Sequence, residues 1–181
     1  MSKRIQPPTC MTCGAAAELR TGGELYPRRR DLWTKWFWVC PTKGCDSYCG
    51  CHPGTKRPLG SPAGPELRRA RGILRTDKID PLWMSAHEHE CYDGHNAQDR
   101  KAIKMIQNAA RTRVYRWLAD QLKIDPKVCH IGMFDLETCR AAWWALKGVD
   151  YPTIRLWAKM REHRDGARLD NVVPFPKRKR A

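Results

Sequence analysis

Two cysteine pairs decide the fold of this chain: Cys10-Met-Thr-Cys13-Gly and Cys40-Pro-Thr-Lys-Gly-Cys45. In each pair, two thiolates can reach one metal ion across a tight turn, and a glycine lets the backbone turn closely. Four thiolates form a closed tetrahedral shell, which predicts one structural Zn²⁺ and leaves no open position for catalysis. Because a segment this short has little core of its own, the metal supplies much of its folding energy.

The fourth ligand has competitors nearby in the sequence. Cys49, Cys51 and His52 follow the second pair closely. We favour Cys45, because Gly44 and the Cys-Pro dipeptide that opens the pair both suit a knuckle turn, although this pair is wider than Cys-x-x-Cys. The alternative is a set of scattered buried cysteines. The predicted metal ligands are Cys10, Cys13, Cys40 and Cys45.

The segment between the two pairs carries strand and turn signals. Trp36-Phe37-Trp38-Val39 is aromatic and β-branched, which predicts a strand that leads directly into the second pair. Glu24-Leu25-Tyr26 is a weaker strand candidate, and Gly22-Gly23 and Tyr26-Pro27 are turn signals. Two knuckles joined by a β-hairpin make a zinc ribbon, which we expect over residues 1–60.

Helical periodicity dominates the remainder of the chain. Residues 65–74 and 98–123 each place apolar side chains on one face of a helix. Asp135 caps a third helix that Gly148 ends, and Pro152 opens a fourth. The sequence therefore predicts an α+β fold, with an N-terminal zinc ribbon followed by a small helical domain of about four helices. The expected segments are the ribbon (1–60), a connecting helix and His-rich insertion (61–95), the helical domain (96–165) and a flexible basic tail (166–181).

The charge of the chain predicts a polyanionic partner. The sequence holds 34 Lys+Arg against 19 Asp+Glu, a formal net charge of +15. Each Lys or Arg placed on a phosphate releases a condensed counterion, which favours binding to nucleic acid. Eight Trp accompany the charge, and Trp offers the flat face on which an unpaired base stacks. The alternative is a generic basic protein that its charge keeps soluble.

Basic residues concentrate near the expected hairpin tip, on the first and second helices, and in the tail. We expect Trp33 to be the exposed aromatic residue beside the hairpin arginines. A solvated charged face is the alternative for the helices, including the face that carries Arg111, Arg113 and Arg116, and a solubilising role is the alternative for the tail. The candidate nucleic-acid contacts are Arg28, Arg29, Arg30, Trp33, Arg68, Arg69, Arg71, Lys177, Arg178, Lys179 and Arg180.

A second group of metal-binding residue types lies in the His-rich insertion. In an extended segment, alternation points His87, His89 and Cys91 to the same side, and His95 follows. Imidazole and thiolate ligands suit a second zinc, and an open position there could activate water. The alternative is a polar surface loop. We interpret Cys129-His130 and Cys139 as core or turn residues that bind no metal.

The sequence also indicates the cellular compartment. No apolar run approaches the roughly 20 residues that span a bilayer, and the first residues lack the apolar stretch of a secretory signal. We therefore expect a cytosolic protein without a membrane partner, in a compartment that keeps thiols reduced. Nine cysteines are an odd number for a disulfide framework, so the pairs are interpreted as metal ligands.

Ten motifs stand out in combination: Cys-x-x-Cys-Gly, Tyr26–Leu32, Trp38–Pro41, Gly50–Thr55, Pro58–Gly60, Glu66–Arg71, Ile79–Trp83, Tyr115–Ala119, Cys129–Asp135 and Cys139–Arg140. Together they resemble the small zinc-finger-containing family of phages and bacteria, which has no established activity. The resemblance covers roughly residues 10–83 and 111–146, with residues 84–110 as an insertion, and implies zinc binding and a phage or prophage origin. The knuckle spacing also partly resembles the zinc ribbons of bacterial topoisomerase I, which bind single-stranded DNA.

These observations favour a non-enzymatic, zinc-stabilised protein that binds DNA or RNA in the cytoplasm of a bacterial host. One alternative is a phage protein that binds a host protein, such as RNA polymerase or a defence effector, with Trp residues as anchors. Another is a zinc-dependent nuclease that uses His87, His89 and His95. The sequence contains no P-loop and no dinucleotide-binding fingerprint.

Overall fold

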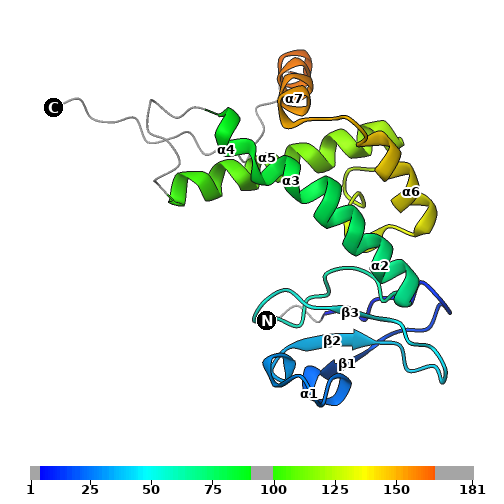
Figure 1. The fold of residues 1–181 in the computed structure, drawn as a ribbon. Helices are drawn as coiled ribbons and strands as arrows, with labels where there is room; N and C mark the ends of the chain where they lie inside the picture. The colour runs from blue at the N-terminus through cyan, green and yellow to red at the C-terminus, as the bar shows by residue number, and fades with distance from the viewer. Residues whose placement is uncertain (1–4, 91–99, 166–181) are drawn as a thin grey trace. The chain divides into compact units, whose positions relative to one another are not determined.

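The computed structural model describes residues 5–90 and 100–165, with side chains described as far as residue 161. The chain has the α+β fold that the sequence predicts, with a small three-stranded sheet followed by helices (Figure 1). It divides into two compact units. The ribbon unit comprises Met1–Arg75 and Lys127–Ala142, and the helical unit comprises Thr76–Pro126 and Trp143–Ala181.

An antiparallel sheet in the order β1-β2-β3 forms the centre of the ribbon unit. Its strands are β1 (Glu18–Thr21), β2 (Trp36–Val39) and β3 (Tyr48–Gly50). β2 has the bounds that the aromatic run predicts. Trp38, in the middle strand, is buried, and its indole N–H donates to the carbonyl of Lys56 at 2.9 Å. Tryptophan burial thus fixes the face of the sheet that turns inward.

The prediction of a strand at Glu24-Leu25-Tyr26 is wrong. Glu24 and Leu25 belong to the short helix α1 (Gly22–Leu25), and Tyr26 follows it. Thr21 and Glu24 form a capping box, in which the Thr21 hydroxyl accepts from the Glu24 N–H and the Glu24 carboxylate accepts from the Thr21 N–H at 2.6 Å. Gly22 is needed here, since a Cβ at this position would lie 1.9 Å from the carbonyl oxygen of Leu32.

A buried arginine connects helix α2 to other segments of the ribbon unit. Helix α2 (Pro65–Leu74) has the predicted bounds, but Arg71, expected on its basic surface, is buried. Its guanidinium donates to the carbonyls of Phe134 at 2.7 Å and Ser61 at 2.9 Å. A charged group leaves water only with such partners, so Arg71 joins segments far apart in the sequence and is not a surface contact.

Two glycines make the closest contact within the same part of the ribbon unit. A Cβ at Gly60 would lie 2.2 Å from the carbonyl oxygen of Gly132, and a Cβ at Gly132 would lie 2.2 Å from that of Leu59. Gly132 belongs to the short 3-10 helix η3 (Ile131–Met133). The backbone of the 127–142 segment therefore packs directly on the chain that leaves the sheet.

In the helical unit, the long helix α5 (Arg100–Leu122) packs against three other helices. These are α3 (Asp80–Met84), α4 (Ala86–His89) and α7 (Tyr151–Asp165). A π-helical turn, η2 (Arg75–Ile79), precedes α3. None of the helices in the described part of the chain is long and apolar enough to cross a membrane. The buried residues of the predicted α5 stripe are Ile106, Ala110, Val114, Trp117 and Leu118.

The third and fourth predicted helices are confirmed with their caps. Helix α6 (Leu136–Ala145) follows Asp135, whose carboxylate accepts from the N–H of Thr138 at 2.7 Å. Helix α7 begins one residue before the predicted Pro152, and Asp150 caps it by accepting from the N–H of Thr153 at 3.0 Å. Short helices α3 and α4 come in addition to the predicted set.

Arg113 was expected on the basic surface of α5 and is instead almost fully buried. Its guanidinium donates to the Glu90 carboxylate at 2.7 Å and to the Tyr151 hydroxyl at 2.8 Å. The Tyr151 hydroxyl also donates to Glu90. Burial, together with the hydrogen bond to Glu90, raises the pKa of Tyr151 to about 12. This polar network joins α4, α5 and α7 beside the apolar core.

Candidate metal centre and nucleic-acid interface

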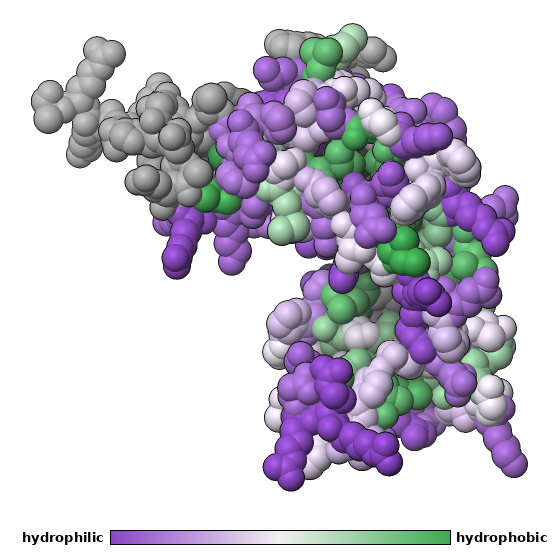
Figure 2. Space-filling view, in the orientation of Figure 1, coloured by the Kyte–Doolittle hydropathy of each residue, from purple (hydrophilic) through white to green (hydrophobic). Residues whose placement is uncertain are grey.

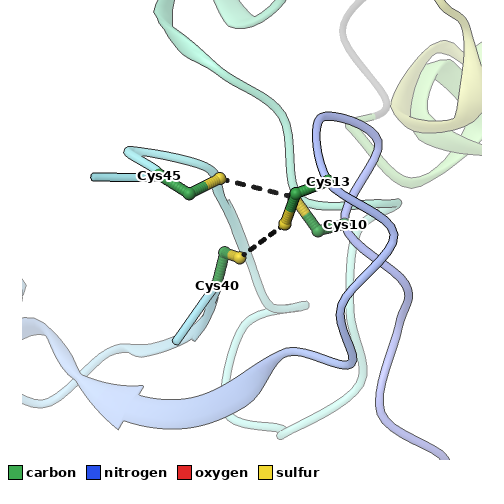
Figure 3. A group of neighbouring side chains, drawn as sticks. All are labelled: Cys10, Cys13, Cys40 and Cys45. Atoms are coloured by element: carbon green, nitrogen blue, oxygen red, sulfur yellow. Dashed lines mark hydrogen bonds between the residues drawn. The ribbon is translucent and has the colours of Figure 1, made fainter. Parts of the chain in front are cut away.

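The four predicted ligands meet in the ribbon unit (Figure 3). Their Sγ atoms all lie within 4.8 Å of one another, at 3.7 Å for Cys10 and Cys45 and 3.3 Å for Cys13 and Cys40. Zn–S bonds of about 2.3 Å in a tetrahedron place sulfurs about 3.8 Å apart, whereas a disulfide requires about 2.0 Å. The four thiols therefore suit a single structural Zn²⁺.

A short turn holds the first cysteine pair. The N–H of Cys10 donates to the carbonyl of Ala15 at 2.9 Å, and the N–H of Gly14 donates to the carbonyl of Cys10 at 3.0 Å. Gly14 has a φ of +76°, in the left-handed region that glycine adopts without strain. An isolated bridge between Thr9 and Ala16 closes the base of the turn, so both sulfurs face one point.

The second pair follows directly from the sheet. Cys40 comes immediately after β2, and its N–H donates to the carbonyl of Ser47 at 2.8 Å. The N–H of Cys45 donates to the carbonyl of Thr42 at 3.0 Å, and Gly44 has a φ of +81°. The strand thus aims the second turn at the first, as the two facing loops in Figure 3 show.

Hydrogen bonds around the sulfurs tune their charge. Buried Ser47 links the two turns through a hydroxyl–hydroxyl hydrogen bond of 2.7 Å to Thr12. Burial acts to raise the pKa of Cys10, but hydrogen bonds with Ser47 and with backbone N–H groups outweigh it and lower this pKa to about 6. Hydrogen bonds with Thr42 act to lower the pKa of Cys40, but the neighbouring thiols raise it to about 11. A metal ion must therefore displace protons to bind, which weakens its binding in acid.

The competitors for the fourth position lie outside the cluster. The Cys49 thiol donates to the carbonyl of Gly60 at 3.1 Å, and burial raises its pKa to about 12. Burial also raises the pKa of Cys51, and His52 is exposed. None of the three contributes to the group of four, so Cys45 is the fourth member, as the turn chemistry predicts.

A comparison with family models agrees with this centre. The model of a zinc-finger-containing domain family matches residues 6–94 and 89–149. The chain belongs to this family. No curated protein and no solved structure shows significant similarity to it. The partial resemblance to topoisomerase ribbons therefore stays unconfirmed. Membership of the family indicates zinc binding and indicates no activity.

The second metal site of this zinc-finger-containing protein stays a prediction. The extended backbone expected there is wrong for the described residues, which are helical. His87 and His89 lie on helix α4, where side chains two residues apart point about 200° apart. The His87 ring nitrogen Nδ1 lies 2.9 Å from the Met84 carbonyl oxygen, and the His89 ring lies beside that of Tyr151. Cys91 and His95 fall outside the described residues.

The remaining cysteines of the ribbon unit are core residues, as predicted. Cys129 and Cys139 are both buried, and burial raises the pKa of each thiol to about 11. His130 accepts a hydrogen bond from the N–H of Gly132 through Nδ1 at 3.2 Å. Within residues 5–90 and 100–161, the Cys10 group is the only cluster of His, Cys, Asp or Glu with metal-binding geometry.

The predicted hairpin contacts lie on the connection between β1 and β2, which includes the 3-10 helix η1 (Arg30–Leu32). Arg28, Arg29 and Arg30 are exposed, and so is Trp33, as expected. Strongly hydrophilic side chains gather over the end of the ribbon unit that carries α1 (Figure 2). Arg29 forms a two-pronged ion pair with Asp31, at 2.9 and 2.8 Å.

The predicted contacts on α2 separate into three kinds. Arg69 is exposed. Arg68 is half-buried, donates to the carbonyl of Asp46 at 2.7 Å, and lies 3.8 Å over the Tyr48 ring. Arg71 is the buried residue described above. The tail contacts, Lys177, Arg178, Lys179 and Arg180, lie outside the described residues.

Sequence reasoning missed the tryptophans that pair with cations from distant segments. Lys56, for example, places its ammonium 4.5 Å from the centre of the Trp36 ring. Lys78 lies at the same distance from the Trp143 ring. These partners are far apart in the sequence, so no local pattern could have identified them.

Proposed function

We propose that this chain is a zinc-stabilised nucleic-acid-binding protein that contacts phosphates and bases through a basic, aromatic surface. One observation carries the proposal: six of the eight Trp have a Lys or Arg over the ring within 5.7 Å. Trp38 and Trp117 have no such cation within the described residues, and both are buried. The pairs are Trp33 with Arg30, Trp36 with Lys56, Trp83 with Arg111, Trp143 with Lys78, Trp144 with Lys147 and Trp157 with Arg161.

Each pair combines the two chemistries that a nucleic acid presents. An uncovered part of the ring, largest in the exposed Trp33 and Trp144, stacks on an unpaired base, and the cation over the ring reaches an adjoining phosphate. The net charge of +15 adds a long-range attraction that brings the polyanion to the surface. The zinc centre performs no chemistry in this proposal, because its four thiolates leave no open position. It stabilises the ribbon unit, which carries the Trp33 and Trp36 pairs.

The origin and compartment follow from the same reasoning. The resemblance to a family of phages and bacteria supports a phage-encoded protein that acts in the host cytoplasm. All eight cysteines in the described part of the chain are free thiols, which suits a reducing compartment.

A salt series tests the proposal. The full chain, with zinc bound, is titrated into labelled single- and double-stranded DNA and RNA at about 50 mM and about 200 mM salt. Six or more phosphate contacts would lower the affinity about a thousandfold between these conditions. We expect a loss of at least about tenfold, since fewer contacts still release counterions. The absence of binding to all four nucleic acids at low salt would contradict the proposal.

A second candidate function is binding to a host protein, and one feature of the helical unit favours it. Trp144 is 66% exposed, and Leu156 and Met160 of α7 are 61% and 58% exposed. The last two lie four residues apart and hence on one face of the helix, next to each other. Large aromatic and apolar side chains of this kind anchor protein interfaces. A partner captured from host lysate that survives nuclease treatment, and is lost in Trp144→Ala, would support this function.

A further inference from the structure

We propose that Trp33 and Arg30 form a stacking site for one unpaired base of single-stranded DNA or RNA. The site lies on the β1–β2 connection of the ribbon unit and rests on the proposed nucleic-acid binding. Its ligand is a base whose face is free, together with the phosphates on either side of it. A duplex does not offer that ligand, because its bases are already stacked on one another.

The indole of Trp33 is held in place on two sides. It lies against Gly23 of α1, where an added Cβ would be in ordinary contact with the ring atoms Cγ and Cδ1 at 3.6 and 3.7 Å. Its Nε1–H donates to the carbonyl of Pro27 at 3.2 Å. A base therefore meets a ring whose orientation is already fixed, which reduces the entropy lost on binding.

The segment that carries the ring is itself well braced. The Thr21–Glu24 capping box fixes the start of α1, and the close approach of Gly22 to Leu32 fixes α1 against η1. Lys35 closes the connection, because its carbonyl accepts from the N–H of Gly22 at 2.8 Å and its N–H donates to Leu32 at 2.9 Å. This connection ends at β2, which leads into the zinc centre.

The exposed part of Trp33 is apolar surface, over which the Arg30 guanidinium lies. The side chain is 43% exposed, whereas Trp38 in the adjacent strand is 6% exposed. Its only polar group, the indole N–H, is already bonded to Pro27. Water gains no hydrogen bond from the remaining ring, so an aromatic ligand face would cover it favourably.

The charges around the ring suit the phosphates of a single strand. The Arg30 guanidinium carbon lies 5.7 Å from the ring centre. Arg29 is held by Asp31, but Arg28 and Arg30 form no ion pair with any described side chain, and both are exposed. Arg30, over the ring, and Arg28, in the same connection, thus keep guanidinium N–H groups that can bind phosphates next to the stacked base.

The experiment compares single strands with a duplex for matched variants. Affinity for labelled single-stranded DNA, single-stranded RNA and a DNA duplex of equal length is measured by fluorescence anisotropy at one salt concentration, with the zinc-loaded full chain. Trp33→Ala removes the platform, and Trp33→Phe keeps a smaller aromatic face. Ile73→Ala is the control, since Ile73 is 42% exposed on α2 and matches Trp33 in exposure.

We expect Trp33→Ala to lower single-strand affinity about tenfold, the usual loss for one stacked base, and to change duplex affinity less than about twofold. Trp33→Phe should restore most of the affinity, and Ile73→Ala should leave it unchanged. The salt dependence should stay the same in Trp33→Ala and fall by about one phosphate contact in Arg30→Gln.

The outcomes separate this inference from the function it rests on. A wild-type chain that binds no nucleic acid would overturn both. Equal wild-type affinity for duplex and single strands would overturn the stacking site alone. An equal loss of affinity for both in Trp33→Ala would do the same. Loss of a nuclease-resistant protein partner in Trp33→Ala, with nucleic-acid binding intact, would show that Trp33 is a protein anchor instead.

Folding is controlled by a second pair of variants. If Trp33→Ala loses its zinc, Trp33→Leu and Trp33→Phe are compared instead, because both keep an apolar side chain over Gly23 and only Phe can stack. Equal single-strand affinity in these two variants would overturn the inference, and a weaker affinity for Trp33→Leu would support it.

Discussion

The ribbon unit contains three short strands joined by turns, whereas the helical unit is built around a 23-residue helix covered by its neighbours. Over residues 5–60, the buried apolar side chains are Cys10, Ala17, Trp38 and Cys40. In the helical unit, α5 alone buries a longer apolar stripe and a charged network at Arg113. The other buried apolar side chains of the ribbon unit come from residues 61–75 and 127–142, so it is the segment 5–60 that depends on a metal for what the helical unit obtains from packing.

This difference assigns separate tasks to the zinc and to the apolar core. The zinc centre connects two turns that would otherwise have almost no buried contacts, so its binding energy is folding energy for the ribbon unit. In the described part of the helical unit, the packing of helices against α5 supplies the stability. The following changes should affect the two units unequally.

Removal of zinc should have the largest effect, and it should fall on the ribbon unit. Structural zinc contributes on the order of 10 kcal/mol to the folding of small zinc domains. With a chelator, amides of β2 should lose protection from hydrogen exchange while those of α5 keep it. Equal loss of protection in both units would contradict the comparison.

Metal content sharpens the same prediction. The purified chain should hold one zinc, and Cys10→Ser should hold none, because three thiolates no longer close the shell. Cys51→Ser is the matched control and should keep one, since Cys51 lies outside the cluster. One equivalent of zinc remaining in Cys10→Ser would instead point to the His87–His95 segment as a second site.

The buried arginine of α5 gives the converse test. Arg113→Met removes one of the two arginines that pair with Glu90, since Arg155 also lies 3.4 Å from its carboxylate, and should lower the free energy of unfolding by about 1.5–3 kcal/mol. Arg116→Met, at an exposed position of the same helix, should change it by less than about 0.5 kcal/mol. Zinc content should stay at one in both variants; loss of zinc in Arg113→Met would show that the units are not energetically separate.

A smaller effect is expected where the backbone of the 127–142 segment packs on the chain that leaves the sheet. Gly132→Ala places a Cβ 2.2 Å from the Leu59 carbonyl oxygen, and relieving this overlap should cost about 1–3 kcal/mol in urea unfolding. Gly72→Ala is the control within α2, where an added Cβ meets nothing within 4 Å. It should stabilise the chain by about 0.5–1 kcal/mol, because alanine favours a helix over glycine.

The capping box should give the smallest change in stability. Thr21→Ala removes the hydroxyl that caps α1 and should cost about 1 kcal/mol. Because α1 supports the Trp33 ring, single-strand affinity should fall several-fold in the same variant. Unchanged affinity with reduced stability would show that the platform does not need α1 to hold its position.

Local signals in the sequence predicted most of the fold and all four metal ligands. The strand Trp36–Val39 and the helix Pro65–Leu74 have the expected bounds. Strand alternation, helical periodicity and helix caps all depend on residues that are close together in the sequence. The error at Glu24 was avoidable, because Thr21-Gly-Gly-Glu24 has the spacing of a capping box.

The errors at Arg71 and Arg113 have a different cause. An arginine on a helix is expected to face water, and only a partner from another segment can make its burial favourable. Those partners are Phe134, 63 residues from Arg71, and Tyr151, 38 residues from Arg113. Nothing in the local sequence identifies them, so they could be found only once the fold was known.

The most direct test of zinc-stabilised nucleic-acid binding is one anisotropy titration, performed with the zinc-loaded chain and again after chelation. A labelled single strand at low salt is the probe. We predict that removing zinc lowers the affinity at least about tenfold, because the ribbon unit no longer holds Arg28, Arg30 and Trp33 in place. Equal affinity with and without zinc would contradict the account.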